Sequence, residues 1–151
     1  MKKTKFLRVL AIIMALCLAA TIFMGCTRKE SVNGYCTVVL GNANQTAYTV
    51  NLDNVTIDNG LISLLDHLKK AEGLTYSCDP SGFLTEVGDV KQDTGAGVYI
   101  YIYTSVEKDQ DVSQYAKAMT YNSSTLVSTG VGAKDMTIED GAVIYIGTIV
   151  W

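Results

Sequence analysis

The sequence predicts an α+β domain in which a mixed or antiparallel sheet packs on one helix. One segment has the apolar spacing of an amphipathic helix, and several short runs are rich in β-branched and aromatic residues. Their order is two strands, the helix and then further strands. The chain of 151 residues is long enough for one domain with a hydrophobic core, and without an N-terminal export segment it is too short for two.

The first predicted element is a β-hairpin. Residues 35–40 are β-branched and apolar, residues 41–45 form a turn cluster, and residues 46–52 alternate between two faces. We therefore expect the two runs to pair with each other. The short run 55–57 is a candidate extension of the same sheet.

Residues 59–72 form the predicted helix. Its apolar stripe, spaced i, i+3, i+4 and i+7, consists of Leu61, Leu64, Leu65 and Leu68. We expect the Asp58 or Asn59 side chain to accept from the first-turn amides, and Gly73 to take the left-handed conformation that ends a helix. His67 lies off the stripe, so we expect it to face solvent and to have no catalytic role.

The C-terminal half supplies the remaining strands. We expect extended segments at residues 74–78, 83–87, 97–104 and 142–151, and a hairpin of residues 115–121 and 125–128. The strongest signal is 97–104, where apolar and tyrosine side chains alternate strictly. Because successive side chains of a strand point to opposite faces, its isoleucine side packs on the helix and its tyrosine side faces away.

Tyrosine side chains supply the candidate binding site. They are Tyr99, Tyr101 and Tyr103 on one face of a strand, with Tyr115 and Tyr121 in the hairpin that follows. Tyrosine rings offer flat apolar area with a polar tip, which suits recognition of sugars, a corrin edge or a partner protein. The alternative is cross-strand aromatic packing on the open face of the sheet, and both interpretations stay open.

The first 25 residues have the features of an export signal, with a basic start and a mostly apolar run that ends at Gly25. The run 21–26 ends on a small residue followed by Cys26, and it resembles the lipobox of bacterial lipoproteins. The resemblance implies a signal peptide at 1–25, lipidation of Cys26, a tether at 26–34 and a domain at 35–151 outside the membrane. An uncleaved anchor helix and ordinary secretion with cleavage nearby stay open as alternatives.

The other cysteines form an even pair in an exported domain. With Cys17 lost in the signal and Cys26 lipidated, Cys36 and Cys78 remain. A disulfide between them would close a loop of about 40 residues and contribute about 3–4 kcal/mol in the chain-entropy model. Two buried free thiols are the alternative. A metal site is not expected, because no second His or Cys stands at ligand spacing near either one.

The exported part is strongly acidic. Loss of four basic residues with the signal leaves 12 − 4 = 8 Lys and Arg against 15 Asp and Glu, a net charge of −7. Such a surface repels phosphate backbones, so nucleic-acid binding is not expected. Asp109-Gln110-Asp111 has a spacing that could hold calcium weakly, but a solvated acidic loop explains it better.

An enzyme is not expected either. His67 is the single histidine, and the sequence contains no nucleophile elbow. Gly95-Ala96-Gly97 precedes a strand rather than a helix, so it is not a phosphate-binding loop. We therefore expect no catalytic residue and no resident cofactor.

Several segments follow one another in a characteristic order. They are residues 59–68, 73–77 and 82–89, a tyrosine-rich strand ending at 105, and a closing run at 140–145. Together they resemble the transcobalamin C-terminal-like domain, a family of unknown function in surface proteins of Gram-positive bacteria. The resemblance covers residues 35–151 and implies a β-grasp-like fold, a sheet that embraces one helix. It also implies a relation to cobalamin carriers, whose larger helical domain this chain is too short to contain.

These observations predict a non-catalytic, membrane-tethered extracellular domain that binds a ligand or a partner protein through its open sheet face. One alternative is accessory capture of a cobalamin-like cofactor for uptake. The other is a surface interaction or adhesion module with no small ligand.

Overall fold

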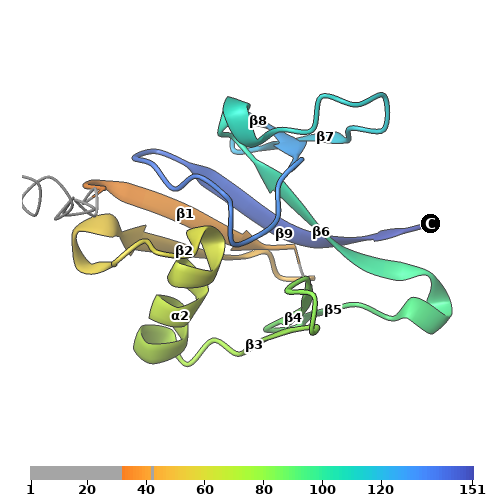
Figure 1. Cartoon of the computed structure of the whole chain (residues 1–151), viewed down its shortest axis with the longest axis horizontal. Coiled ribbons are helices and arrows are strands. Elements are labelled where there is room, and N and C mark those ends of the chain that lie inside the picture. Colours follow the sequence, from red (N-terminus) through yellow and green to blue (C-terminus); the bar gives the residue numbers. More distant parts are fainter. Residues whose placement is uncertain (1–31, 42) are drawn as a thin grey trace, which may run out of the picture. The chain divides into compact units, whose positions relative to one another are not determined.

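The computed structural model describes residues 32–41 and 43–151, and the expected signal and lipidation site lie outside them. Within these residues the α-helix is α2 (Gly60–Glu72), and three short 3-10 helices are η1 (Leu52–Asn54), η2 (Thr94–Ala96) and η3 (Glu107–Asp109). The strands, shown in Figure 1, are β1 (Tyr35–Leu40), β2 (Thr46–Asn51), β3 (Tyr76–Cys78), β4 (Leu84–Val87), β5 (Val90–Lys91), β6 (Val98–Thr104), β7 (Ala118–Tyr121), β8 (Ser124–Ser128) and β9 (Val143–Val150).

The main sheet has six strands in the order β2-β1-β9-β6-β8-β7. β1 and β2 pair as the predicted antiparallel hairpin, β9 lies parallel to β1, and β6 lies antiparallel to β9. The C-terminal strand β9 therefore runs through the middle of a mixed sheet, between β1 and β6 (Figure 1). The predicted α+β class, with a mixed sheet packed on one helix in a β-grasp-like arrangement, is confirmed.

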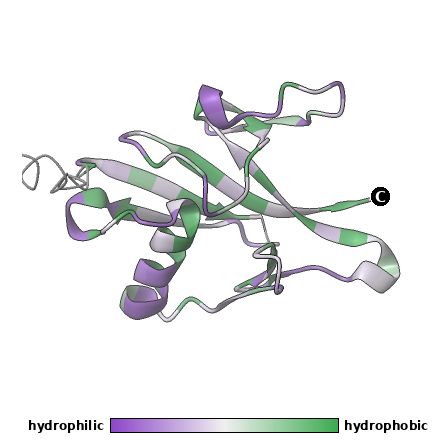
Figure 2. Ribbon diagram, in the orientation of Figure 1, coloured by the Kyte–Doolittle hydropathy of each residue, from purple (hydrophilic) through white to green (hydrophobic). Residues whose placement is uncertain are grey.

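The core lies between α2 and one face of this sheet. Leu61, Leu64 and Leu65 of the predicted stripe are 0% exposed. The sheet residues that pack with the stripe include Cys36, Val38, Leu40, Ile144 and Ile146. Figure 2 shows the matching alternation of hydrophobic and paler segments along β1 and β9. Burial of a leucine side chain is worth about 1.5–3 kcal/mol, so the stripe anchors the helix to the sheet.

The two ends of α2 are capped in different ways. At the C-terminal end, Gly73 has a φ of 72° and its N–H donates to the Leu68 carbonyl, as the sequence predicts. At the N-terminal end the prediction for Asn59 is wrong, because its side chain makes no cap hydrogen bond. Instead the Ser63 hydroxyl oxygen accepts from the backbone N–H groups of Asp58 and Asn59, at 3.0 and 2.9 Å.

Three segments differ from the sequence-based expectation. Residues 55–57 form no strand and connect η1 to α2. The polar stretch 88–97 contains β5 and η2, and β3, β4 and β5 form a separate antiparallel sheet. The predicted hairpin begins at Ala118, and its tight turn is made by Asn122 and Ser123 with φ values of 45° and 68°. Such positive φ values match the twist of the flanking strands.

Candidate functional site

The face of the main sheet that points away from α2 carries aromatic side chains. Tyr103 of β6 is directly opposite Tyr145 of β9, which in turn is opposite Val39 of β1. Directly opposite residues share a face of a sheet, and the neighbouring β9 residues Ile144 and Ile146 point into the core on the other face. The side chains that we call the tyrosine face are Tyr99, Tyr101, Tyr103, Tyr121, Tyr145 and Trp151.

Four of these rings contact one another. The ring centroids are 5.4 Å apart for Tyr101 and Tyr103, 6.2 Å for Tyr103 and Tyr145, and 6.2 Å for Tyr121 and Tyr145. Desolvation by burial, followed by the charges of Tyr101 and Tyr145, raises the pKa of Tyr103, so its hydroxyl stays protonated at neutral pH. The contacts of Tyr145 with Tyr103 and Tyr121 join different strands, as the packing interpretation expects, whereas the Tyr101–Tyr103 contact lies within β6.

Two glycines let the Tyr145 ring lie against the sheet. A Cβ at Gly41 would lie 2.6 Å from Cε1 of that ring, and a Cβ at Gly147 would lie 2.9 Å from the same atom. Carbon atoms make favourable contacts only at about 3.5–4.0 Å, so a side chain at either position would displace the ring. The two glycines therefore fix the position of Tyr145 on the tyrosine face.

One end of the tyrosine face is open to solvent. Tyr99 is 38% exposed and Trp151 is 66% exposed, whereas the four contacting tyrosines are half-buried. The ammonium group of Lys117 lies 5.7 Å from the centroid of the Trp151 ring, a cation–π contact. The aromatic surface is thus held in place by its own ring contacts and still has free area for a ligand.

The structure brings together four of the five predicted site residues. Tyr115 is the exception: it precedes β7, is 65% exposed and takes part in none of the ring contacts found in the described residues. Two members of the face, Tyr145 and Trp151, are absent from the sequence-based set. The signal that could have found them is the alternation of the last strand, in which Tyr145, Gly147, Ile149 and Trp151 share one side.

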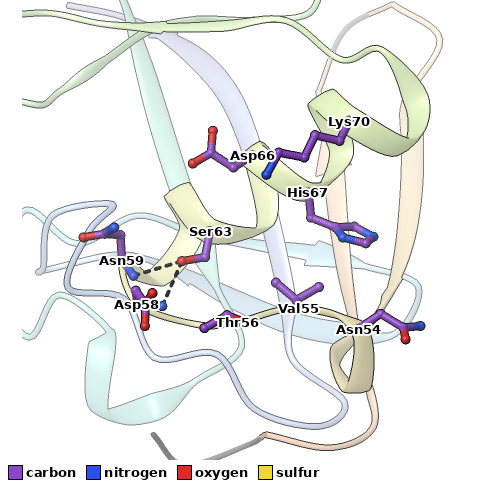
Figure 3. Close-up of a pocket in the computed structure, with 9 residues that line it drawn as sticks. All are labelled: Asn54, Val55, Thr56, Asp58, Asn59, Ser63, Asp66, His67 and Lys70. Carbon is purple, nitrogen blue, oxygen red and sulfur yellow. Dashed lines mark hydrogen bonds between the residues drawn. The ribbon is translucent and has the colours of Figure 1, made fainter.

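A second candidate is a polar hollow of about 350 Å³ between α2 and the loop before it (Figure 3). Its lining includes Asn54, Asp58, Ser63, Asp66, His67 and Lys70. His67 lies off the leucine stripe, as expected, and is half-buried in the lining of this hollow. Asp66 accepts a 2.7 Å hydrogen bond from the Tyr76 hydroxyl, outside the hollow's lining. Within the described residues no hydrogen bond joins His67 to Ser63 or Asp66.

The expectation of a solvated acidic loop is wrong for Asp109, which is buried. Asp109 is 5% exposed. Its carboxylate accepts hydrogen bonds from the backbone N–H of Thr137 and, at 3.1 Å, from the Thr137 hydroxyl. Its backbone carbonyl accepts from the Gly130 N–H at 2.8 Å. A buried carboxylate is tolerated when it is hydrogen-bonded, so Asp109 joins η3 to the segment before β9 and has a structural role.

The two cysteines of the domain are not bonded to each other. Cys36 is fully buried in the core, where desolvation raises the pKa of its thiol to about 12. Cys78 is exposed on β3, in the other sheet. The disulfide alternative is therefore wrong, and the alternative of two buried thiols holds for Cys36 alone.

Fold and site together define an α+β, β-grasp-like domain with an aromatic open face. No family model matches the chain and no curated protein matches it, so the resemblance to the transcobalamin C-terminal-like domain stays a prediction. Among solved structures, the chain is similar to a "putative metal binding protein" from Ruminococcus gnavus, with a TM-score of 0.50 and 12% sequence identity, over 79% of this chain and 99% of that one. At this identity the likeness shows the fold alone.

Two further properties concern the described part of the chain. In residues 32–41 and 43–151, no group of three or more His, Cys, Asp or Glu side chains is arranged to hold a metal ion. Across the same residues, no helix has the length and apolarity needed to cross a membrane.

Proposed function

We propose that residues 35–151 form a non-catalytic binding domain, tethered to the outer face of the cell membrane through Cys26, and that its tyrosine face binds a ligand or partner protein. The observation that carries this proposal is the exposure of Tyr99 and Trp151 at the open end of a packed aromatic surface. Contiguous exposed apolar surface on a soluble domain commonly marks an interaction site, and tyrosine and tryptophan are enriched in such sites.

The chemistry of the tyrosine face favours a flat or apolar ligand over an anion. Its polar groups are tyrosine hydroxyls and one indole N–H, and the cation that contacts it, Lys117, already lies over the Trp151 ring. Rings held in place before binding lose little conformational entropy when a ligand stacks on them. Sugar rings, a corrin edge and apolar side chains all offer a surface of this kind.

The hollow around His67 supports the non-catalytic part of the proposal. A Ser-His-Asp arrangement consists of a nucleophile, a base and an orienting acid that are hydrogen-bonded to one another. Here the Ser63 hydroxyl oxygen accepts two backbone N–H groups, and the Asp66 carboxylate accepts from Tyr76. Both groups therefore serve the fold around α2.

Capture from intact cells tests the proposal. The wild-type protein is compared with a Tyr99→Ser/Tyr101→Ser double variant and with Tyr115→Ser, a matched control whose side chain is 65% exposed and lies off the tyrosine face. We expect the wild type and the control to retain the same bound molecules and the double variant to lose them. Equal retention by all three proteins would count against the proposal.

Cobalamin is the ligand suggested by the resemblance to the transcobalamin C-terminal-like domain, and Trp151 provides a reporter for it. Trp151 is the single tryptophan of the chain, so its fluorescence reports on the tyrosine face alone. A saturable change on adding cobalamin, lost in the Tyr99→Ser/Tyr101→Ser variant, would support this ligand. No fluorescence change and no heat at millimolar concentration would exclude it while leaving other ligands of the face to the capture experiment.

A further inference from the structure

The main chain of β6 bonds to other segments at both ends of its free edge, the edge turned away from β9. Val98 exchanges two hydrogen bonds with Asp93, at 2.8 and 2.9 Å, and the Ile102 carbonyl accepts from the Thr129 N–H at 2.9 Å. In an antiparallel strand, alternate residues bond to opposite sides. Ile100 lies between Val98 and Ile102, so its N–H and carbonyl point to this same edge.

A gap in the pairing therefore lies between the Asp93 and Thr129 contacts. Within the described part of the chain, the Ile100 N–H, the Ile100 carbonyl and the Ile102 N–H make no hydrogen bond. The gap spans four residue steps, or about 13 Å at the rise of a β-strand. It offers two donors and one acceptor in the spacing that an adjacent strand would use.

Two hollows open beside this gap. Their volumes are about 350 and about 210 Å³, and both are lined by Phe83, Leu84, Ile100 and Ile102. The smaller hollow has no charged residue in its lining, and the larger one has a single charged residue, Asp79. The Phe83 side chain is 67% exposed at their common wall, which leaves apolar surface beside the free edge.

We propose that an extended peptide segment of a partner protein adds to the free edge of β6 in this gap. In a parallel alignment, one peptide residue donates its N–H to the Ile100 carbonyl and accepts from the Ile102 N–H. An apolar side chain of the segment fills the smaller hollow against Phe83. A Lys or Arg of the segment lies near Asp79, in keeping with the acidic charge of the whole domain.

Amide hydrogen exchange followed by NMR on the purified full chain tests the proposal. In the free protein, the Ile100 and Ile102 amides should exchange fast and the Tyr101 amide, which faces β9, slowly. The probe is an equimolar mixture of acetylated pentapeptides with Val, Ile or Leu at the centre, Thr on both sides and Lys at one end. At millimolar concentration the mixture should slow exchange at Ile100 and Ile102 about tenfold or more.

Two controls make the result specific. The same peptides N-methylated at the central residue cannot donate to Ile100 and should slow nothing. Phe83→Ala and Tyr115→Ala form a matched pair, since the two side chains are 67% and 65% exposed. Phe83→Ala should weaken peptide binding about tenfold through lost apolar contact, and Tyr115→Ala should leave it unchanged.

Several results would overturn the proposal. They are slow exchange at Ile100 and Ile102 in the free protein, no slowing with the peptide mixture, equal slowing with the methylated mixture, and equal effects of the two alanine variants. The proposal concerns the edge of β6 and not its tyrosine side, so failure here leaves the capture experiment on the tyrosine face unaffected.

Discussion

Replacing Gly41 with alanine tests whether the Tyr145 ring is held against the sheet as the structure describes. The added Cβ would lie 2.6 Å from Cε1 and Cζ of that ring, far inside the distance of ordinary carbon contacts, so the ring must move. The φ angle of Gly41 is not positive, so the substitution adds no left-handed backbone strain. The expected effect is therefore steric and concerns one side chain.

The displaced ring loses its contacts with Tyr103 and Tyr121. At about 0.5–1.5 kcal/mol for each aromatic pair, the free energy of unfolding should fall by about 1–3 kcal/mol, measured by urea denaturation. In a Tyr145→Ala background the same Gly41→Ala change should cost less than about 0.5 kcal/mol, because no ring remains to be displaced. Gly95→Ala is the control, since its Cβ would meet one carboxylate oxygen at 3.4 Å and nothing else within 4 Å. An equal cost of Gly41→Ala with and without the Tyr145 ring would refute this reasoning.

Three further perturbations test other parts of the structure. Asp109→Ala leaves buried donors unpaired, so urea denaturation should show a loss of about 1–3 kcal/mol, and an unchanged midpoint would speak against the buried carboxylate. In thiol labelling followed by peptide mapping, Cys78 should react in the native protein and Cys36 only after unfolding; equal rates would contradict the assignment. Burial and the hydrogen bond to Asp66 raise the pKa of Tyr76 to about 12, compared with about 10 in an unfolded chain. The folded state holds this proton more tightly, so the stabilisation is complete below about pH 10 and is lost as the pH rises towards 12. Tyr103 also has a raised pKa, so an absorbance titration should show more than one late tyrosine, and Tyr76→Phe should lower the late amplitude by one tyrosine. An unchanged late amplitude would exclude this assignment.

Elements whose structure depends on their own side chains could be predicted from the sequence. The leucine spacing gives α2 to within one residue, and the tyrosine–isoleucine alternation gives β6, because burial of one face is a local property. Contacts between distant segments could not be predicted in this way. Asp109 lies 28 residues before the hydroxyl that it binds on Thr137, and no local pattern links the two.

The candidate site depends on both kinds of information. Alternation along β6 is enough to put Tyr99, Tyr101 and Tyr103 on one side. Tyr145 joins them because β9 inserts between β1 and β6, which is a property of the strand order and not of any single segment. Whether Cys36 and Cys78 form a disulfide could not be predicted for the same kind of reason. Their spacing in the sequence does not reveal that they belong to different sheets.

Chemical labelling of aromatic side chains on intact cells tests most directly whether the tyrosine face binds something. A membrane-impermeant reagent that modifies exposed tyrosine and tryptophan rings is applied to the cells and to the purified protein, and the modified positions are found by peptide mapping. Tyr115 is the internal control, since it is 65% exposed and lies outside the tyrosine face. We predict that Tyr99 and Trp151 are modified several-fold more slowly on cells than in the purified protein, with Tyr115 unchanged. Equal rates at all three positions in both samples would contradict a bound partner or ligand.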